Sequence, residues 1–218
     1  PMGTQGGHGF ILHDGTKVVS GNAADAGDLI DVQTFGSNGT WTRPGNATKV
    51  LVKLIGGGGG GAGYCESGGA GGYAEGYFNV TGVSTVAVTV GGGGSGVGYY
   101  TTGGSGGTTS SGSYLSATGG GGANTWSSHS GYVNLQGGGG AGHTNSVGSW
   151  PGGRGGYGYF GGGATTARNH SNLGSPPQKL KLGAPGSGGP GGQSDGWGGA
   201  GDRGQNGETG MVVVFSYK

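Results

Sequence analysis

Nine glycines recur at every third residue near the C-terminus, and this repeat limits what the chain can fold into. The in-phase positions run from Gly183 to Gly210, and Asp195 takes the remaining slot of the ten. A three-residue period matches neither an α-helix nor a β-strand; it is the repeat of the extended polyproline-II helix. That helix has no internal backbone hydrogen bonds, so its N–H and C=O groups must bond to neighbours. The repeat therefore predicts a bundle of closely packed glycine helices.

Collagen has the same three-residue period and is the main alternative for this run. Only Pro185 and Pro190 lie within it, which would make a weak triple helix. Glycine runs also occur elsewhere, at residues 56–61, 91–94, 119–122 and 137–140. An intrachain bundle accounts for all of these runs, so we favour it.

The composition alone is typical of disorder, because glycine and proline contribute 67 and 7 of the 218 residues. Ordinary β-strand patterns between the glycine runs argue against disorder. Apolar residues make up only 30% of the chain, too few for a core across all of it. We therefore expect an all-β fold with a small β-sandwich-like core, a glycine-rich polyproline-II (polyglycine II) bundle and long loops.

Several segments have the alternation of β-strands. A short hairpin is expected near residues 10–19, a second over residues 32–42 around Asn38-Gly39, and a third over residues 77–90. Residues 49–55 predict a strand that is largely covered on both faces, and residues 211–217 a closing strand. The glycine runs start where strands end, so each strand is expected to lead into an extended glycine segment.

Charge and cysteine content exclude several classes of protein. The formal net charge is +1 and no basic patch exists, which argues against nucleic-acid binding. The single Cys65 excludes an intrachain disulfide framework, and no apolar run approaches the length of a membrane helix. No secretory signal is visible. The chain begins Pro1-Met2, as after removal of a tag, so we expect a fragment of a longer protein.

The order of strands and glycine runs resembles the glycine-rich tip domain of phage tail fibres. The resemblance rests on residues 35–44, on residues 50–59 and 86–94, where strands pass into glycine runs, and on residues 201–217. The sequence is also similar to receptor-recognising adhesins of long-tail-fibre tips and to fibre-like adhesins of bacteria. The resemblance implies residues 1–31 as a connector to a fibre shaft and residues 32–218 as the tip. Within the tip, the β-core is expected at about 32–90 and 211–218, with a glycine-rich excursion at 91–210.

The same resemblance implies a non-enzymatic, receptor-binding function. The partner would be a bacterial cell-surface glycan or outer-membrane protein, and the protein would be a homotrimer joined through an upstream fibre shaft. Its location would be the tip of a virion tail fibre or an extracellular fibre of a bacterium. Two alternatives remain. One is an ice-binding protein, against which the bulky loops and the β-core argue, and the other is a structural glycine-rich protein, which would need no ordered tip.

Aromatic clusters between the glycine runs are the candidate receptor contacts, because aromatic rings in small-residue loops give contact area at low entropic cost. Each ring has an alternative role, which is to cover the glycine bundle; for Tyr64 and Tyr73, beside the β-core, packing is favoured. The candidate residues are Tyr99, Tyr100, Trp126, His129, Tyr132, Trp150, Tyr157, Tyr159, Phe160 and Trp197.

The sequence contains little that indicates a cofactor site, a metal site or a catalytic site. The five histidines lack metal-site spacing with cysteine or carboxylate, although a trimer can hold an ion on its axis through one histidine per chain. Asp195 and Asp202 are a conceivable glycosidase pair, but both lie at or near the period-three run, where solvated surface is expected. We therefore expect no enzyme activity, no cofactor and no metal.

Overall fold

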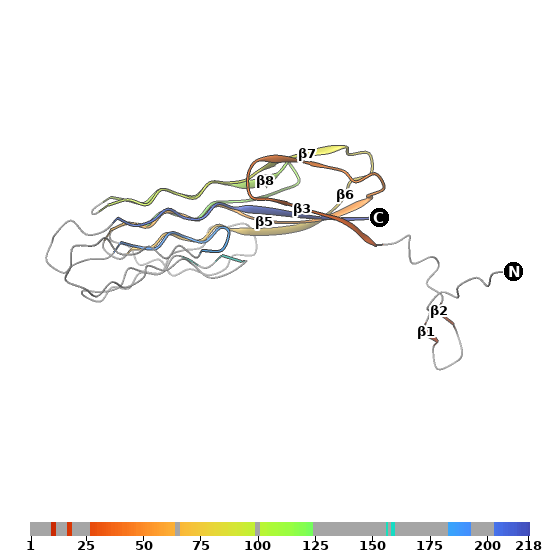
Figure 1. Cartoon of the computed structure of the whole chain (residues 1–218), viewed down its shortest axis with the longest axis horizontal. Helices are drawn as coiled ribbons and strands as arrows, with labels where there is room; N and C mark the ends of the chain where they lie inside the picture. Colours follow the sequence, from red (N-terminus) through yellow and green to blue (C-terminus); the bar gives the residue numbers. More distant parts are fainter. Residues whose placement is uncertain are drawn as a thin grey trace.

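The computed structural model places two four-stranded β-sheets at one end of a set of extended glycine segments (Figure 1). It describes residues 10–11, 17–18, 27–63, 66–98, 101–123, 156, 158–159, 183–192 and 203–218. No helix occurs in these residues, and therefore none that could span a membrane. The all-β class expected from the sequence is confirmed.

Among the described residues all strand pairs are antiparallel, and three of the seven pairs join strands that do not follow one another in the sequence. Their bounds are β1 Phe10–Ile11, β2 Lys17–Val18, β3 Leu29–Phe35, β4 Gly39–Thr42, β5 Lys49–Ile55, β6 Tyr73–Asn79, β7 Thr85–Thr89, β8 Thr109–Ser111, β9 Leu115–Ala117 and β10 Met211–Tyr217. The expected hairpin near the N-terminus is confirmed as the β1–β2 pair.

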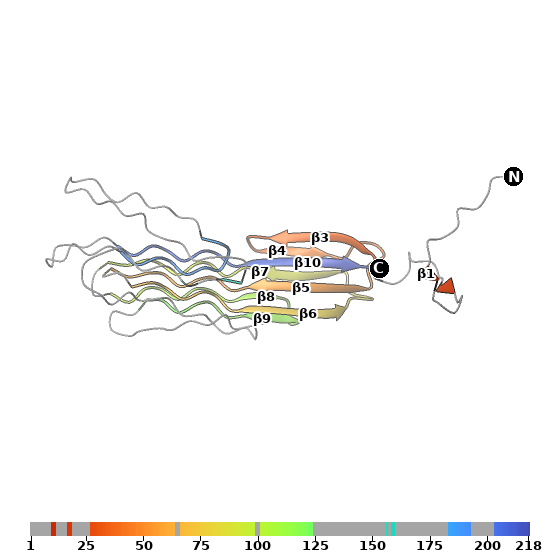
Figure 2. The same ribbon diagram turned by 90° about the horizontal axis from the view of Figure 1, so that it is seen from below.

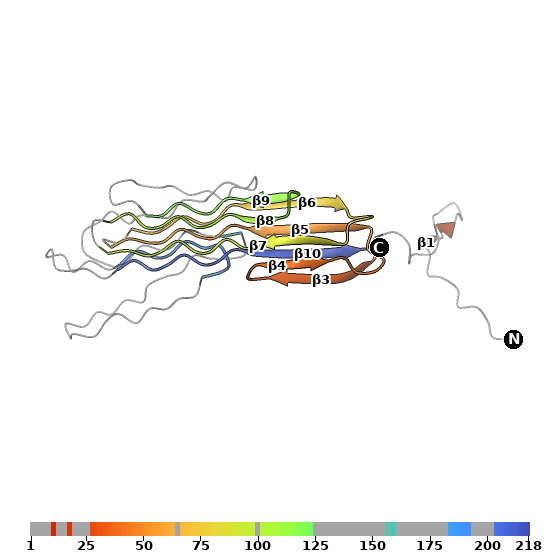
Figure 3. The same ribbon diagram turned by 90° about the horizontal axis from the view of Figure 1, so that it is seen from above.

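Two sheets form the sandwich, with the orders β3-β10-β5-β6 and β4-β7-β8-β9. Figures 2 and 3 show the sandwich from opposite sides. Alternate residues of each strand face the core between the sheets: Val50, Val52 and Leu54 of β5 are buried, as are Val212 and Val214 of β10. Trp41 of β4 is also buried there, 2% exposed. The closing strand returns to the core as predicted, between β3 and β5.

The two longer predicted hairpins are wrong. β3 and β4 flank the Asn38-Gly39 turn, but β3 pairs with β10 while β4 pairs with β7 in the other sheet. β6 and β7 likewise belong to different sheets, since β6 pairs with β5. Both connections are arches that cross from one sheet to the other. Asn38 supports the first arch, because its side-chain oxygen accepts a hydrogen bond of 2.8 Å from the amide of Val90.

The β-core extends further than the sequence indicated. β3 begins at Leu29, before residue 32, and β8 and β9 lie within the segment assigned to the glycine excursion. These two strands are three residues each and rich in serine, so their apolar signal is weak. They still complete the second sheet, with Thr109 and Ala117 buried.

Beyond the sandwich, one glycine segment is surrounded by six others. The central segment, residues 56–63, continues directly from β5, and all its residues are buried. Its backbone amides donate hydrogen bonds of 2.8 to 2.9 Å to three neighbouring segments in turn, so that every third amide bonds to the same segment. Gly56, Gly59 and Ala62 donate to residues 66–72, Gly57 and Gly60 to residues 104–107, and Gly58 and Gly61 to residues 205–208. Its carbonyls accept, at 2.7 to 3.0 Å, from three further segments: 94–97, 120–123 and 189–192.

The six surrounding segments, called here the ring segments, are also bonded to one another. In order around the centre they are 66–72, 118–123, 101–107, 91–98, 203–210 and 183–192, and each adjacent pair shares backbone hydrogen bonds. Exposure in the ring follows the three-residue period: Gly204, Gly207 and Gly210 are buried while Arg203, Asn206 and Thr209 are exposed. A three-residue repeat of partners is what a helix with three residues per turn would give.

The two ends of this domain are opposite one another. At the sandwich end, the amide of Gly27 donates to the carbonyl of Lys218 at 3.2 Å, and the amide of Lys218 to that of Asp28 at 3.0 Å. The far end of the bundle lies away from the C-terminus (Figure 1). The chain therefore joins residues 1–26 at one end and projects its glycine segments at the other.

Candidate functional site

Only one of the ten predicted receptor-binding residues falls within the described part of the chain. It is Tyr159, which is 42% exposed. The other nine lie outside the described residues: Tyr99, Tyr100, Trp126, His129, Tyr132, Trp150, Tyr157, Phe160 and Trp197.

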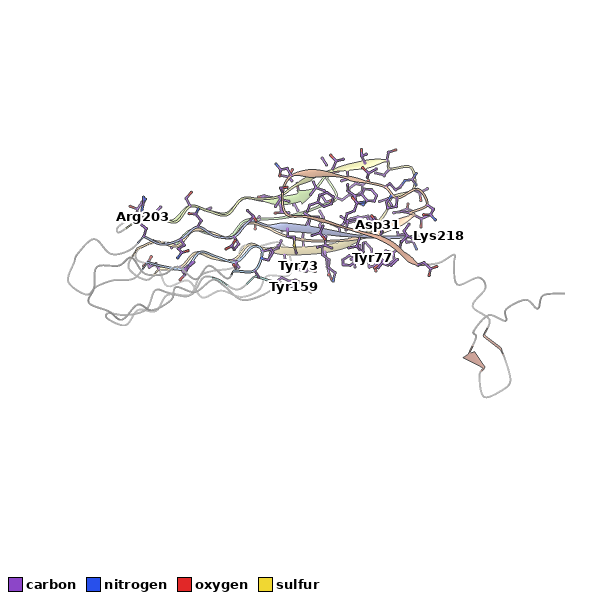
Figure 4. All side chains as sticks on the ribbon, viewed as in Figure 1. Asp31, Tyr73, Tyr77, Tyr159, Arg203 and Lys218 are labelled. Carbon is purple, nitrogen blue, oxygen red and sulfur yellow. The ribbon has the colours of Figure 1, made fainter. Side chains whose placement is uncertain are left out.

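Tyr159 lies where the sandwich meets the bundle, stacked on Tyr73 of β6 (Figure 4). The two ring centroids are 3.5 Å apart and the planes differ by 12°. Tyr73 is 2% exposed, so the preference for a packing role there is confirmed. Gly158 allows this close approach, since a Cβ at that position would lie 2.9 Å from the carbonyl oxygen of Pro185 and 3.2 Å from Ile55. One face of the Tyr159 ring is thus packed although the residue is partly exposed, and its role as a receptor contact stays a prediction.

A polar chain begins at Tyr73 and crosses to β5. The Tyr73 hydroxyl donates to Oε2 of Glu75 at 2.7 Å, and the same oxygen lies 3.5 Å from Nζ of Lys53. Burial raises the pKa of Tyr73 far above its usual value, and its hydrogen bonds with Glu75 and Tyr159 raise it further. The hydrogen bond from Tyr73 lowers the pKa of Glu75, and Lys53 lowers it as well. The phenol stays neutral and the carboxylate stays charged at neutral pH.

A second tyrosine pair lies further along β6, and the sequence did not single it out. Tyr77 is 66% exposed and its ring centroid is 6.1 Å from that of Tyr217 on β10. Burial raises the pKa of Tyr217 above its usual value, and a hydrogen bond with Tyr77 raises it further. The sequence could have indicated this pair through the two-residue period of β6, which puts Tyr73, Glu75 and Tyr77 on one face of that strand. In Figure 4 the Tyr73, Tyr77 and Tyr159 side chains lie on one side of the molecule.

The far end of the bundle is defined by hydrogen bonds among residues that flank the tip connections. Gly63 donates to Gly98, Gly103 to Ala123, Gly192 to Ala62 and Gly204 to Val97. Arg203 marks this end in Figure 4. Segments 64–65, 99–100, 124–155 and 193–202 are therefore joined to the described chain at or near this end, and their sequences contain seven of the ten predicted contact residues. Their own structure lies outside the described residues.

Within the described ranges, no group of three or more His, Cys, Asp or Glu side chains lies together as a metal site. Comparison with curated proteins finds no match. The family model for a glycine-rich domain matches residues 31–216, which covers all seven glycine segments and both sheets except the first two residues of β3 and the last residue of β10. The chain therefore belongs to the glycine-rich domain family.

Proposed function

We propose that this domain is the non-enzymatic receptor-binding tip of a tail fibre or of a fibre-like adhesin. In this proposal it attaches to a bacterial cell-surface glycan or outer-membrane protein through aromatic loops. Its location is then the tip of a virion tail fibre or of an extracellular bacterial fibre. The observation that carries the proposal is the direction of the chain through the molecule.

The chain enters and leaves the domain at one end, at Gly27 and Lys218. At the opposite end the described segments 91–98, 118–123 and 183–192 stop, and the sequence between them and the next described segments contains Tyr99, Tyr100, Trp126, Trp150 and Trp197. A protein fixed through residues 1–26 would therefore present these connections outward. An attachment tip requires this separation between the end that is anchored and the end that meets the receptor.

The hydrogen bonds among the glycine segments favour a rigid array, which would hold such loops in fixed positions. We interpret it as a polyglycine II bundle, in which each central residue bonds to neighbours in a threefold rotation. The central segment would be about 25 Å long if it rises about 3.1 Å per residue. Loops held on a rigid support lose less conformational entropy on binding, which favours affinity.

Several copies joined upstream, as in the homotrimer that the resemblance implies, would add avidity to a weak single contact. Binding to cells should therefore be measured both for single copies of the domain and for several copies joined together.

The experiment compares binding of the full chain to bacterial cells, and to a glycan array, with that of alanine variants. Trp126→Ala and Trp150→Ala should each reduce binding at least about fivefold while the melting temperature changes by no more than about one degree, because loop contacts of this kind are worth about 1–3 kcal/mol. Tyr114→Ala is the control, since Tyr114 is a partly exposed aromatic on the sandwich, against Phe78.

Unchanged binding by both tryptophan variants would overturn the proposal. A fall in melting temperature that matches the fall in binding would instead assign these rings to packing of the bundle.

A further inference from the structure

Two tyrosine pairs involve strand β6, and their ring geometries differ. The rings of Tyr73 and Tyr159 are nearly parallel, with centroids 3.5 Å apart and planes that differ by 12° (Figure 4). The rings of Tyr77 and Tyr217 are tilted by 35°, with centroids 6.1 Å apart. Aromatic pairs in proteins ordinarily have centroids about 4.5–7 Å apart and avoid a direct face-to-face arrangement. The Tyr77–Tyr217 contact is therefore an ordinary one, whereas the Tyr73–Tyr159 contact is unusually close.

The Tyr73 and Tyr159 rings lie directly over one another. Their centroid distance is no longer than the contact distance between two carbon atoms, about 3.5–4.0 Å, so little room is left for a lateral offset. Their hydroxyl groups are hydrogen-bonded to each other, so the two rings also point in the same direction. The carbons next to each hydroxyl-bearing carbon, the ortho carbons, are therefore brought close together. Reacting atoms held about 3–3.5 Å apart are already placed for a bond to form.

The surroundings hold both rings in this arrangement. The Tyr73 side chain is buried, and its hydroxyl donates a hydrogen bond of 2.7 Å to Oε2 of Glu75. The backbone before Tyr159 fits closely against the sandwich, because a Cβ at Gly158 would lie 3.2 Å from Cδ1 of Ile55. Neither ring has to be moved into place before the two can react.

We propose that Tyr73 and Tyr159 form a site of oxidative cross-linking, at which hydrogen peroxide and a peroxidase join the two rings as dityrosine. Each phenol loses one electron and one proton and becomes a phenoxyl radical, whose unpaired electron is shared with its ortho carbons. The two radicals form a bond between two ortho carbons, and the hydrogens on these carbons then return to the oxygens, which restores both phenols. The peroxide takes up the two electrons and two protons and leaves as two water molecules.

Exposure and hydrogen bonding assign a part to each residue. Tyr159 is partly exposed, so an oxidant in solution reaches this ring first. Tyr73 is buried, so the Tyr159 radical takes an electron from it across the stack, and a second oxidation of Tyr159 completes the radical pair. Glu75 is charged at neutral pH and accepts the proton of Tyr73 through their hydrogen bond.

The cross-link would join two residues that lie far apart in the sequence. It would fix residues 158–159 to β6, at the boundary between the sandwich and the glycine array. A cross-link that closes a long loop lowers the entropy of the unfolded chain, so the cross-linked protein should have a higher melting temperature. The inference does not depend on the receptor proposed for the far end.

Oxidation of the full chain with a peroxidase and hydrogen peroxide tests the proposal, with cross-linked peptides identified by mass spectrometry. A major product should be the peptide pair that contains Tyr73 and Tyr159, with two hydrogens lost. A mixture of unlabelled and ¹⁵N-labelled protein distinguishes cross-links within one chain, which are expected, from cross-links between chains. The yield should exceed that of the Tyr77–Tyr217 pair at least about fivefold, because the closer rings are better placed to react.

Tyr159→Phe should abolish this product. Tyr77→Phe is the matched control, since it removes a more exposed tyrosine from the same face of β6 and should leave the yield unchanged. Glu75→Gln removes the carboxylate that accepts the proton and should slow formation of the product severalfold. Circular dichroism checks that each variant folds. In denaturant, where the rings are not held together, the wild type should lose its preference for the Tyr73–Tyr159 pair.

Three results would overturn the proposal. They are no Tyr73–Tyr159 product from the folded wild type, cross-links between chains only, and a yield no higher than that of the Tyr77–Tyr217 pair. Each of these is measured on the wild-type chain, so the outcome does not depend on whether a variant folds.

Discussion

At the residue scale, glycine at positions 56–61 is required by space rather than by backbone flexibility. A Cβ at Gly58 would overlap the carbonyl group of Ser187, and one at Gly60 would overlap that of Ser95. Neighbours surround the central segment on all sides, so no direction is open for a side chain. At Gly121 of a ring segment a Cβ would meet no atom within 4 Å. The six-residue glycine run 56–61 therefore lies at the centre of the array, whereas the ring segment 203–210 needs glycine only at every third residue.

Gly58→Ala and Gly121→Ala test this distinction. Gly58→Ala should destabilise the fold by about 3 kcal/mol or more, because a backbone carbonyl has to move to admit the methyl group. Gly121→Ala should be neutral or stabilise by up to about 1 kcal/mol, because it reduces the entropy of the unfolded chain. Chemical denaturation of both variants measures the difference. Equal loss of stability would show that flexibility, rather than space, selects glycine at these positions.

At the element scale, strand patterns in the sequence predict where strands lie but not which strands pair. The alternation in residues 32–42 correctly identifies two strands and the turn between them. It cannot distinguish a hairpin from an arch, because in both cases the apolar residues of the two strands face the same core. The cross-strand partner of Trp41 is Val86 of β7 and not a residue of β3. β8 and β9 carried too few apolar residues to be predicted at all.

For the candidate site, too, the sequence predicted roles for single residues but not which residues lie together. The sequence predicted a contact role for Tyr159 and a packing role for Tyr73. The stacking of the two rings could not be predicted, because it depends on residues 158–159 returning to β6 from far along the chain. The expectation that residues 49–55 are covered on both faces is wrong for the outer face of the sheet, where Leu51 and Lys53 are partly exposed.

The polar chain between β5 and β6 predicts an alkaline transition. The pKa of Tyr73 is raised in the folded state, so its contribution to stability is fully present below the ordinary tyrosine pKa of about 10 and is lost as pH rises above it. Tyr73→Phe cannot ionise. The difference in melting temperature between wild type and Tyr73→Phe should therefore fall between about pH 9 and pH 11. Both proteins keep Tyr217, whose raised pKa cancels in the comparison. A constant difference would contradict the assignment.

At the scale of the whole molecule, the sandwich and the glycine array form one hydrogen-bonded body. Ile55 passes from β5 straight into the central segment, and Gly210 leads straight into β10. Across the boundary, Gly91 donates to the side-chain oxygen of the buried Thr109 at 3.0 Å and accepts from Gly210. An array bonded in this way should not behave as a flexible appendage, although its composition is that of a flexible linker.

Amide hydrogen exchange tests this whole-molecule property. The amides of Gly57 to Gly61 each donate to a backbone carbonyl and are buried, so their exchange should require the same global opening as the amides of Val52 and Leu54 in β5. Protection in the two groups should therefore agree and fall together as denaturant is added. Gly121→Ala, which leaves the centre unchanged, should preserve this agreement. Early exchange of the glycine amides while β5 stays protected would show that the array opens independently, and a rigid mount for the far end would then be excluded.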